Sequence, residues 1–139
     1  FINFCALSTA KGMTVNMKDI NFIRGNYINF LGEREKDIKD TIIMLQKEDR
    51  IDEANLEKIK LNVVKIFFRM FIMSNNDNPE ILREKYLGFF DKITRPWYVN
   101  RDKALEFEKE EDVIIEKIKI QEAEILKKKF KNIVESEVI

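Results

Sequence analysis

The sequence contains no histidine, and only one cysteine, two prolines and four glycines among its 139 residues. Without histidine, this chain cannot form a Ser–His or Cys–His nucleophile pair, the usual catalytic zinc sites, or a histidine general acid or base. The four glycines are isolated from one another, so the sequence has no glycine-rich phosphate loop. We therefore expect a protein that is not an enzyme and that has no catalytic residue, cofactor or metal ligand.

The single cysteine and the balanced charge limit the expected location and partners. Cys5 cannot form a disulfide within the chain, which favours a reducing, cytoplasmic location. The 25 basic and 25 acidic side chains cancel, whereas a nucleic-acid-binding protein usually carries a basic excess. Nucleic acid is therefore not the expected partner. A protein partner, or a second copy of the chain, fits the composition better.

Composition and hydrophobic spacing indicate the fold class. Hydrophobic residues make up 45% of the chain, which is enough to build a core at this length, and the scarcity of glycine and proline disfavours a many-stranded fold. Apolar residues recur every three or four positions, which predicts amphipathic helices. The predicted fold is an all-α, up-down bundle of about four helices, two long (about 17–49 and 100–136) and two shorter (52–73 and 79–93).

Residues 17–139 are interpreted as a single bundle domain and residues 1–16 as an N-terminal arm of uncertain origin. Ser8-x-Ala10 also resembles a signal-peptide cleavage site, but no basic segment precedes it in the sequence, so we favour the arm.

The segment 52–73 has the strongest helical pattern. Its apolar side chains leave only one narrow polar stripe, which suits a helix inside a bundle or across a membrane. Its charged residues interrupt every run before about 20 apolar residues accumulate, so we expect no membrane span. Asp52 is the expected N-cap of this helix, and the turn formers after Met73 mark its end. We place 52–73 at the buried centre of the bundle.

Glycine and proline suggest the remaining boundaries. Gly25 and Gly32 either let a neighbouring helix approach closely or interrupt the first helix, which we interpret as one long helix with a possible interruption near Gly32. Pro96 predicts that the third helix ends ahead of it, at about residue 93. Asn100 is then the expected cap of the last helix. The two long helices are expected to project past the core, where their apolar ends find a partner.

Arg95, Trp97 and Tyr98 are the predicted interaction residues. They include the only tryptophan, and these three residue types dominate binding hot spots. The alternative is that Trp97 only fixes the turn between the third and fourth helices, with its indole N–H bonded to a backbone carbonyl.

The last predicted helix is acidic in its first part and basic in its second. This order complements the helix dipole, which is the simpler explanation. The sharper hypothesis is antiparallel self-association, in which the acidic half of one copy lies along the basic half of another. An apolar stripe at heptad-like spacing supports it: Ala104, Phe107, Ile114, Ile118, Gln121 and Ile125.

The expected function is that of a small, non-enzymatic helical interaction module that forms a homodimer. The first alternative is a small-ligand-binding or carboxylate–metal protein with a pocket between the second and third helices. Its candidate lining residues are Phe67, Phe71, Tyr86, Phe89 and Phe90, and its first metal-ligand candidates are Glu106, Glu110 and Glu111. A further alternative is nucleic-acid binding by Lys58, Lys65 and Arg69 together with the lysines of the last helix.

Overall fold

The computed structural model describes residues 15–137 of the chain. Within that range four helices follow one another, and a short strand lies at either end. The elements are β1 (Val15–Met17), α1 (Ile20–Lys47), α2 (Ile51–Met73), α3 (Pro79–Glu106), α4 (Glu110–Val134) and β2 (Glu135–Glu137). The predicted all-α bundle is confirmed. The expected arm over residues 1–16 lies outside the described residues except for its last two positions.

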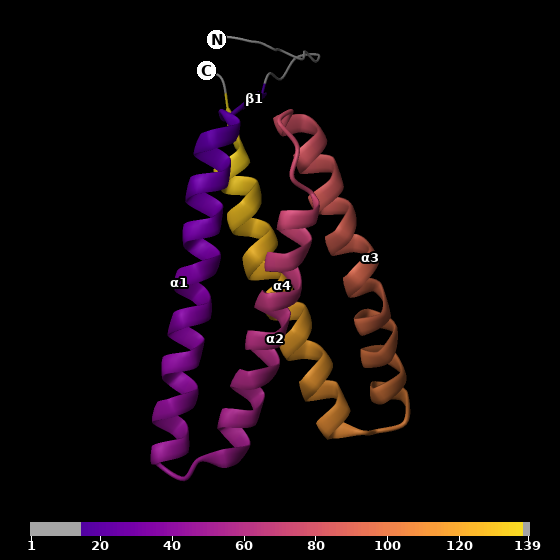
Figure 1. Ribbon diagram of the computed structural model, residues 1–139. Coiled ribbons are helices and arrows are strands. Elements are labelled where there is room, and N and C mark those ends of the chain that lie inside the picture. The colour runs from indigo at the N-terminus through magenta and orange to yellow at the C-terminus, as the bar shows by residue number, and fades with distance from the viewer. Residues whose placement is uncertain (1–14, 138–139) are drawn as a thin grey trace.

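The helices form two antiparallel hairpins, α1 with α2 and α3 with α4 (Figure 1). At the top of Figure 1, where α1 begins and α4 ends, the hairpins pack together, and α2 crosses α4 near the middle of the view. Toward the α1–α2 and α3–α4 turns, the hairpins diverge. Helix α4 packs against all three other helices, so it shares the centre of the bundle with α2.

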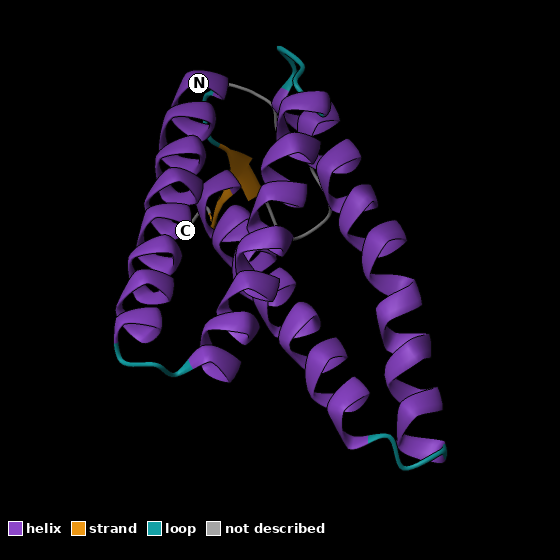
Figure 2. Ribbon diagram, turned by 60° about the horizontal axis from the view of Figure 1, so that its bottom comes forward, coloured by secondary structure: helices purple, strands orange, loops and turns teal. Residues whose placement is uncertain are grey.

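A two-stranded antiparallel sheet joins the two ends of the described chain (Figure 2). In this sheet Val15 pairs with Glu137 and Met17 with Glu135. The Lys18 N–H also donates to the carbonyl of Val134, at 3.0 Å. These bonds fix the beginning of α1 beside the end of α4. Among the described residues, no helix combines the length and apolar character that crossing a membrane requires.

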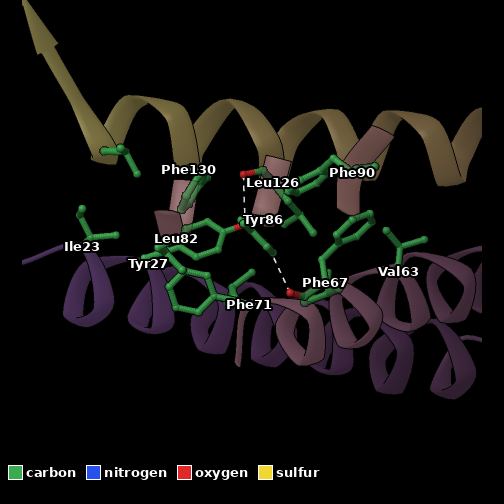
Figure 3. Close-up of a cluster of buried hydrophobic side chains, with 14 of the residues drawn as sticks. Ile23, Tyr27, Val63, Phe67, Phe71, Leu82, Tyr86, Phe90, Leu126 and Phe130 are labelled. Atoms are coloured by element: carbon green, nitrogen blue, oxygen red, sulfur yellow. Dashed lines mark hydrogen bonds between the residues drawn. The ribbon is translucent and has the colours of Figure 1, made fainter. Parts of the chain in front are cut away.

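The core lies where the two hairpins meet, and aromatic rings fill it (Figure 3). Phe67 of α2 stacks on Phe90 of α3, with ring centroids 4.0 Å apart and an interplanar angle of 9°. Tyr86 lies edge-on to Phe130, at 4.8 Å. Tyr27 of α1 lies edge-on to both of these rings. All four helices therefore supply rings to one packed cluster.

The hydroxyls of Tyr27 and Tyr86 connect all four helices inside this cluster. The two oxygens are 2.8 Å apart, the Tyr27 hydroxyl lies 3.2 Å from the carbonyl of Leu126, and the Tyr86 hydroxyl lies 3.0 Å from the carbonyl of Phe67 (Figure 3). Because each phenol donates only one hydrogen bond, the two hydroxyls can donate in only two of these three contacts. Burial raises the pKa of both phenols well above the usual value of 10.0.

The raised pKa values predict an alkaline loss of stability. Above about pH 10 the two tyrosines ionise in the unfolded chain but stay protonated in the folded one, so each lowers the free energy of unfolding by about 1.4 kcal/mol per pH unit. We expect urea unfolding followed by circular dichroism between pH 9 and 11.5 to show a steeper fall for the wild type than for the double variant Tyr27→Phe/Tyr86→Phe. Lysine ionisation is common to both proteins. Parallel profiles would contradict the buried-phenol explanation.

Helix α3 passes through Pro96, so the predicted end at about residue 93 is wrong. An interior proline costs a helix about 3 kcal/mol, because it lacks the N–H that closes a turn and its ring meets the preceding turn. Tertiary packing holds the chain on both sides of it. Before the proline, Phe90 stacks on Phe67. After the proline, Trp97 lies edge-on to Phe67, with ring centroids 6.4 Å apart and an interplanar angle of 90°. These contacts outweigh the local preference.

The limits of the last helix were also predicted wrongly. Asn100 lies inside α3 and is not a cap, and α4 begins at Glu110. Helices α1 and α3 have 28 residues each, α2 has 23 and α4 has 25. The four helices are therefore roughly 35–42 Å long. The expected pair of long helices projecting past the core is not present.

The two hairpin turns share one geometry. In each, a residue in the left-handed region follows the helix: Asp49 with φ 60° and Glu108 with φ 54°. The next N–H then donates to the carbonyl five residues back, from Arg50 to Leu45 at 2.9 Å and from Lys109 to Ala104 at 2.8 Å. This is the Schellman arrangement, which usually has glycine at the left-handed position.

Three other expectations about helix continuity and helix caps are settled by the structure. Helix α1 continues through Gly25 and Gly32, and a Cβ at either position would meet no atom within 4 Å, so neither glycine breaks the helix or admits a close neighbour. Asn78 caps α3 as expected, with Pro79 at the first helical position and the Asn78 side chain accepting from the Glu80 N–H at 2.8 Å. The expected cap at Asp52 is wrong, because α2 begins at Ile51 and its N-cap position is Arg50.

Candidate interaction surface

The predicted interaction residues lie in the middle of α3 and do not form one patch. Trp97 is half-buried against Phe67, and Lys119 Nζ lies 5.8 Å from its ring centroid. Trp97 therefore joins α3 to α2 and α4 and does not lie in a turn. Arg95 is exposed and pairs with Asp91 one turn earlier on the same helix. Tyr98 is exposed and faces the Arg101 guanidinium, 5.1 Å from its ring.

A more continuous surface lies on α4. We call it the outer stripe and define it as Ile114, Ile118, Gln121 and Ile125. Their spacing of four, three and four residues keeps them on one side of a helix. Ile114 is 48% exposed and Ile125 is 42% exposed, Gln121 is exposed and Ile118 is half-buried. The outer stripe is therefore a mainly apolar surface, three isoleucines and one glutamine, that the described residues leave largely uncovered.

The opposite side of α4 is buried and holds the helix in place. Its apolar members include Val113, Ile120, Ala123, Leu126, Phe130 and Val134. Arg34 of α1 forms an ion pair with Glu122 of α4, whose side chain is 1% exposed. The guanidinium donates twice, from Nε at 2.7 Å and Nη2 at 2.8 Å, and the pairing raises the pKa of Arg34. These contacts fix which face of α4 points outward.

Of the predicted apolar stripe, only these four residues lie together. Ala104 belongs to α3 and is buried, and Phe107 lies in the α3–α4 turn with 66% of its surface exposed. The sequence indicated the spacing of the outer stripe but wrongly placed Ala104 and Phe107 on the same helix.

Charges are separated along α4 as the sequence predicted. Glu110, Glu111 and Asp112 form the first turn and are exposed. Near the other end, Lys128 and Lys129 are exposed, and Lys129 Nζ lies 5.6 Å from the ring of Phe30. The outer stripe thus has acidic side chains at one end and basic side chains at the other.

A hollow of about 430 Å³ lies beside the α3–α4 turn, and sequence reasoning did not identify it. Its lining residues are Asn100, Lys103, Ala104, Phe107, Lys109, Asp112 and Glu116. Glu116 is only 8% exposed; its Oε2 accepts from Lys119 Nζ at 3.1 Å, while Oε1 is buried without a described partner. The lining charges balance, so the hollow selects neither an anion nor a cation by net charge.

The ligand-binding alternative placed a pocket between α2 and α3, among rings that the structure packs against each other. Phe67, Phe71, Tyr86 and Phe90 are buried in the aromatic cluster. For the metal version of that alternative, the described residues contain no group of three carboxylate, cysteine or histidine side chains close enough to hold an ion.

Comparisons with known protein families, with curated proteins and with solved structures found no match to this chain.

Proposed function

We propose that this protein is a non-enzymatic helical interaction module that binds a second copy of itself through the outer stripe of α4. The observation that carries the proposal is an apolar stripe outside the core on a helix whose opposite face is already buried. A helix with one buried face normally presents polar residues on the other. Burying Ile114 and Ile125 in a contact accounts for their positions.

The size of the stripe predicts a dimer of modest affinity. Burying a half-exposed isoleucine recovers on the order of 1 kcal/mol, since full burial is worth about 1.5–3 kcal/mol. Two copies contribute four such side chains, and association carries costs of several kcal/mol in lost freedom. The four isoleucines together recover only about 4 kcal/mol, which these costs offset, so we expect a weak, concentration-dependent dimer that also draws on contacts beyond the isoleucines.

Sedimentation equilibrium over a wide concentration range tests this proposal. The wild-type chain of 16.6 kDa is expected to approach twice that mass as its concentration rises. The double variant Ile114→Gln/Ile125→Gln is expected to stay monomeric at the same concentrations, because it removes the apolar contact. It should keep the wild-type fold, since surface substitutions usually change stability by less than about 0.5 kcal/mol each.

A matched variant controls for the general loss of surface hydrophobicity. Ile72 and Met73 at the end of α2 are 55% and 61% exposed, so Ile72→Gln/Met73→Gln removes similar apolar area from another helix. It should dimerise like the wild type. Constant monomer mass for the wild type, or equal weakening by both double variants, would argue against the outer stripe.

Three expectations from the sequence belong to the same proposal. They are the absence of enzymatic activity, a cytoplasmic location and a preference for protein over nucleic acid. Arg95, Trp97 and Tyr98 remain a predicted second contact, in which only Arg95 and Tyr98 offer mainly exposed side chains.

A further inference from the structure

The charges on α4 have a fixed position relative to the outer stripe. Glu110 and Lys128 are 18 residues apart, which is five helical turns, so they lie on the same flank of the stripe. Glu111 and Lys129 are also 18 residues apart and lie on the opposite flank. Each flank therefore carries an acidic residue at its beginning and a basic residue at its end. None of the four forms an ion pair with another described side chain, so all four can pair with a partner.

We propose that the occupant of the outer stripe is the α4 of a second copy, packed antiparallel about a two-fold axis between Ile118 and Gln121. This proposal rests on the proposed self-association and adds its orientation and register. Ile114 would then lie opposite Ile125 of the partner subunit, and Ile118 opposite Gln121 of the partner subunit.

The same register pairs these four flanking charges. In an antiparallel pair of helices, each flank meets the same flank of the partner. Glu110 then faces Lys128 of the partner subunit, while Glu111 faces Lys129 of the partner subunit on the other side. A two-fold axis repeats both pairs, so the contact closes with two copies. The apolar stripe and the flanking charges are separate features, and the same antiparallel register satisfies both.

A parallel arrangement does not fit these residues. It would place Glu110 and Glu111 against the same residues of the partner subunit, and Lys128 and Lys129 likewise, which is repulsive at both ends. An unrelated protein partner would have to reproduce the acid-to-base order of α4 in reverse. A second copy carries that order already.

Charge reversal at one end, followed by mixing, tests the register. The acidic-end variant is Glu110→Lys/Glu111→Lys and the basic-end variant is Lys128→Glu/Lys129→Glu. Each alone places like charges together at both ends of the dimer, and we expect its self-association to weaken at least tenfold. An equimolar mixture restores opposite charges at both ends, so heterodimers should form with near wild-type affinity, as measured by sedimentation with one variant fluorescently labelled.

Two controls keep the result interpretable. The variant Lys85→Glu/Lys92→Glu reverses two exposed lysines of α3 and should dimerise like the wild type. Circular dichroism of each variant shows whether α4 has kept its fold, and association in the mixture requires folded chains. Recovery on mixing, with dimerisation that weakens as salt rises, supports the antiparallel register.

Failure of this inference differs from failure of the proposed function. If the wild type dimerises and both charge-reversed variants do so equally well, the outer stripe stays a self-association surface but the antiparallel register is wrong. If the variants dissociate and mixing restores nothing, the register is also wrong. If the wild type is monomeric throughout, both proposals fall.

Discussion

Replacing Arg34 with methionine is expected to lower the free energy of unfolding by about 3 kcal/mol, because it leaves the Glu122 carboxylate buried without its cation. The Glu122 side chain is 1% exposed, and Arg34 supplies both of its described charged hydrogen bonds. Breaking a fully buried pair costs about 3–5 kcal/mol, and the lower value applies here since the Arg34 side chain is 30% exposed. Urea unfolding followed by circular dichroism measures the change.

The double variant Arg34→Met/Glu122→Leu separates two quantities. One is the net contribution of the ion pair to the free energy of unfolding, and the other is the cost of leaving one charge buried without its partner. With both charges replaced by apolar groups of similar size, most of the loss should disappear, since a buried ion pair often contributes little net stability. A double variant as unstable as Arg34→Met would contradict this explanation. It would show instead that α1 and α4 depend on the ion pair itself.

Replacing Phe67 with alanine is expected to destabilise the fold by about 3–5 kcal/mol. Phe67 is fully buried, stacks on Phe90 and lies edge-on to Tyr86 and Trp97. Its ring therefore joins the α1–α2 hairpin to the other hairpin, and its removal leaves a cavity where the two meet. The contacts of Phe90 and Trp97 with this ring, on either side of Pro96, would be lost at the same time.

Phe107→Ala is the matched control for Phe67→Ala. Phe107 is 66% exposed in the α3–α4 turn, so its removal should change the free energy of unfolding by less than about 0.5 kcal/mol. Equal losses for the two variants would show that the aromatic cluster does not carry the stability assigned to it.

The fold class was predictable because apolar spacing dominates this sequence. Helix α2 was located within one residue of each end, and the Asn78–Pro79 start of α3 was identified by its capping chemistry. The α3–α4 boundary was missed for two physical reasons. Pro96 suggested a break that core contacts overrule, and the real turn carries Glu108 in a left-handed conformation where glycine would have marked it.

The candidate site was predictable only in part. The spacing of Ile114, Ile118 and Ile125 and the charge separation along α4 are local patterns, which sequence reasoning can detect. Whether that stripe points inward or outward depends on contacts between distant segments, such as Arg34 with Glu122. Trp97 was singled out for its residue type. Its half-buried position follows from the continuation of α3 through Pro96, which the sequence did not predict.

Distance measurement between spin labels in the dimer tests the proposed antiparallel packing of α4 against α4 of the partner subunit. With Cys5 replaced by serine, a single label at Gln121→Cys should give a short intermolecular distance, because this position lies near the proposed two-fold axis. A label at Glu110→Cys should give about 30 Å or more, since Glu110 would lie some 19 residues along the helix from its counterpart, at about 1.5 Å per residue. Equally short distances at both positions would indicate parallel helices, and no intermolecular distance at Gln121→Cys would contradict self-association through the outer stripe.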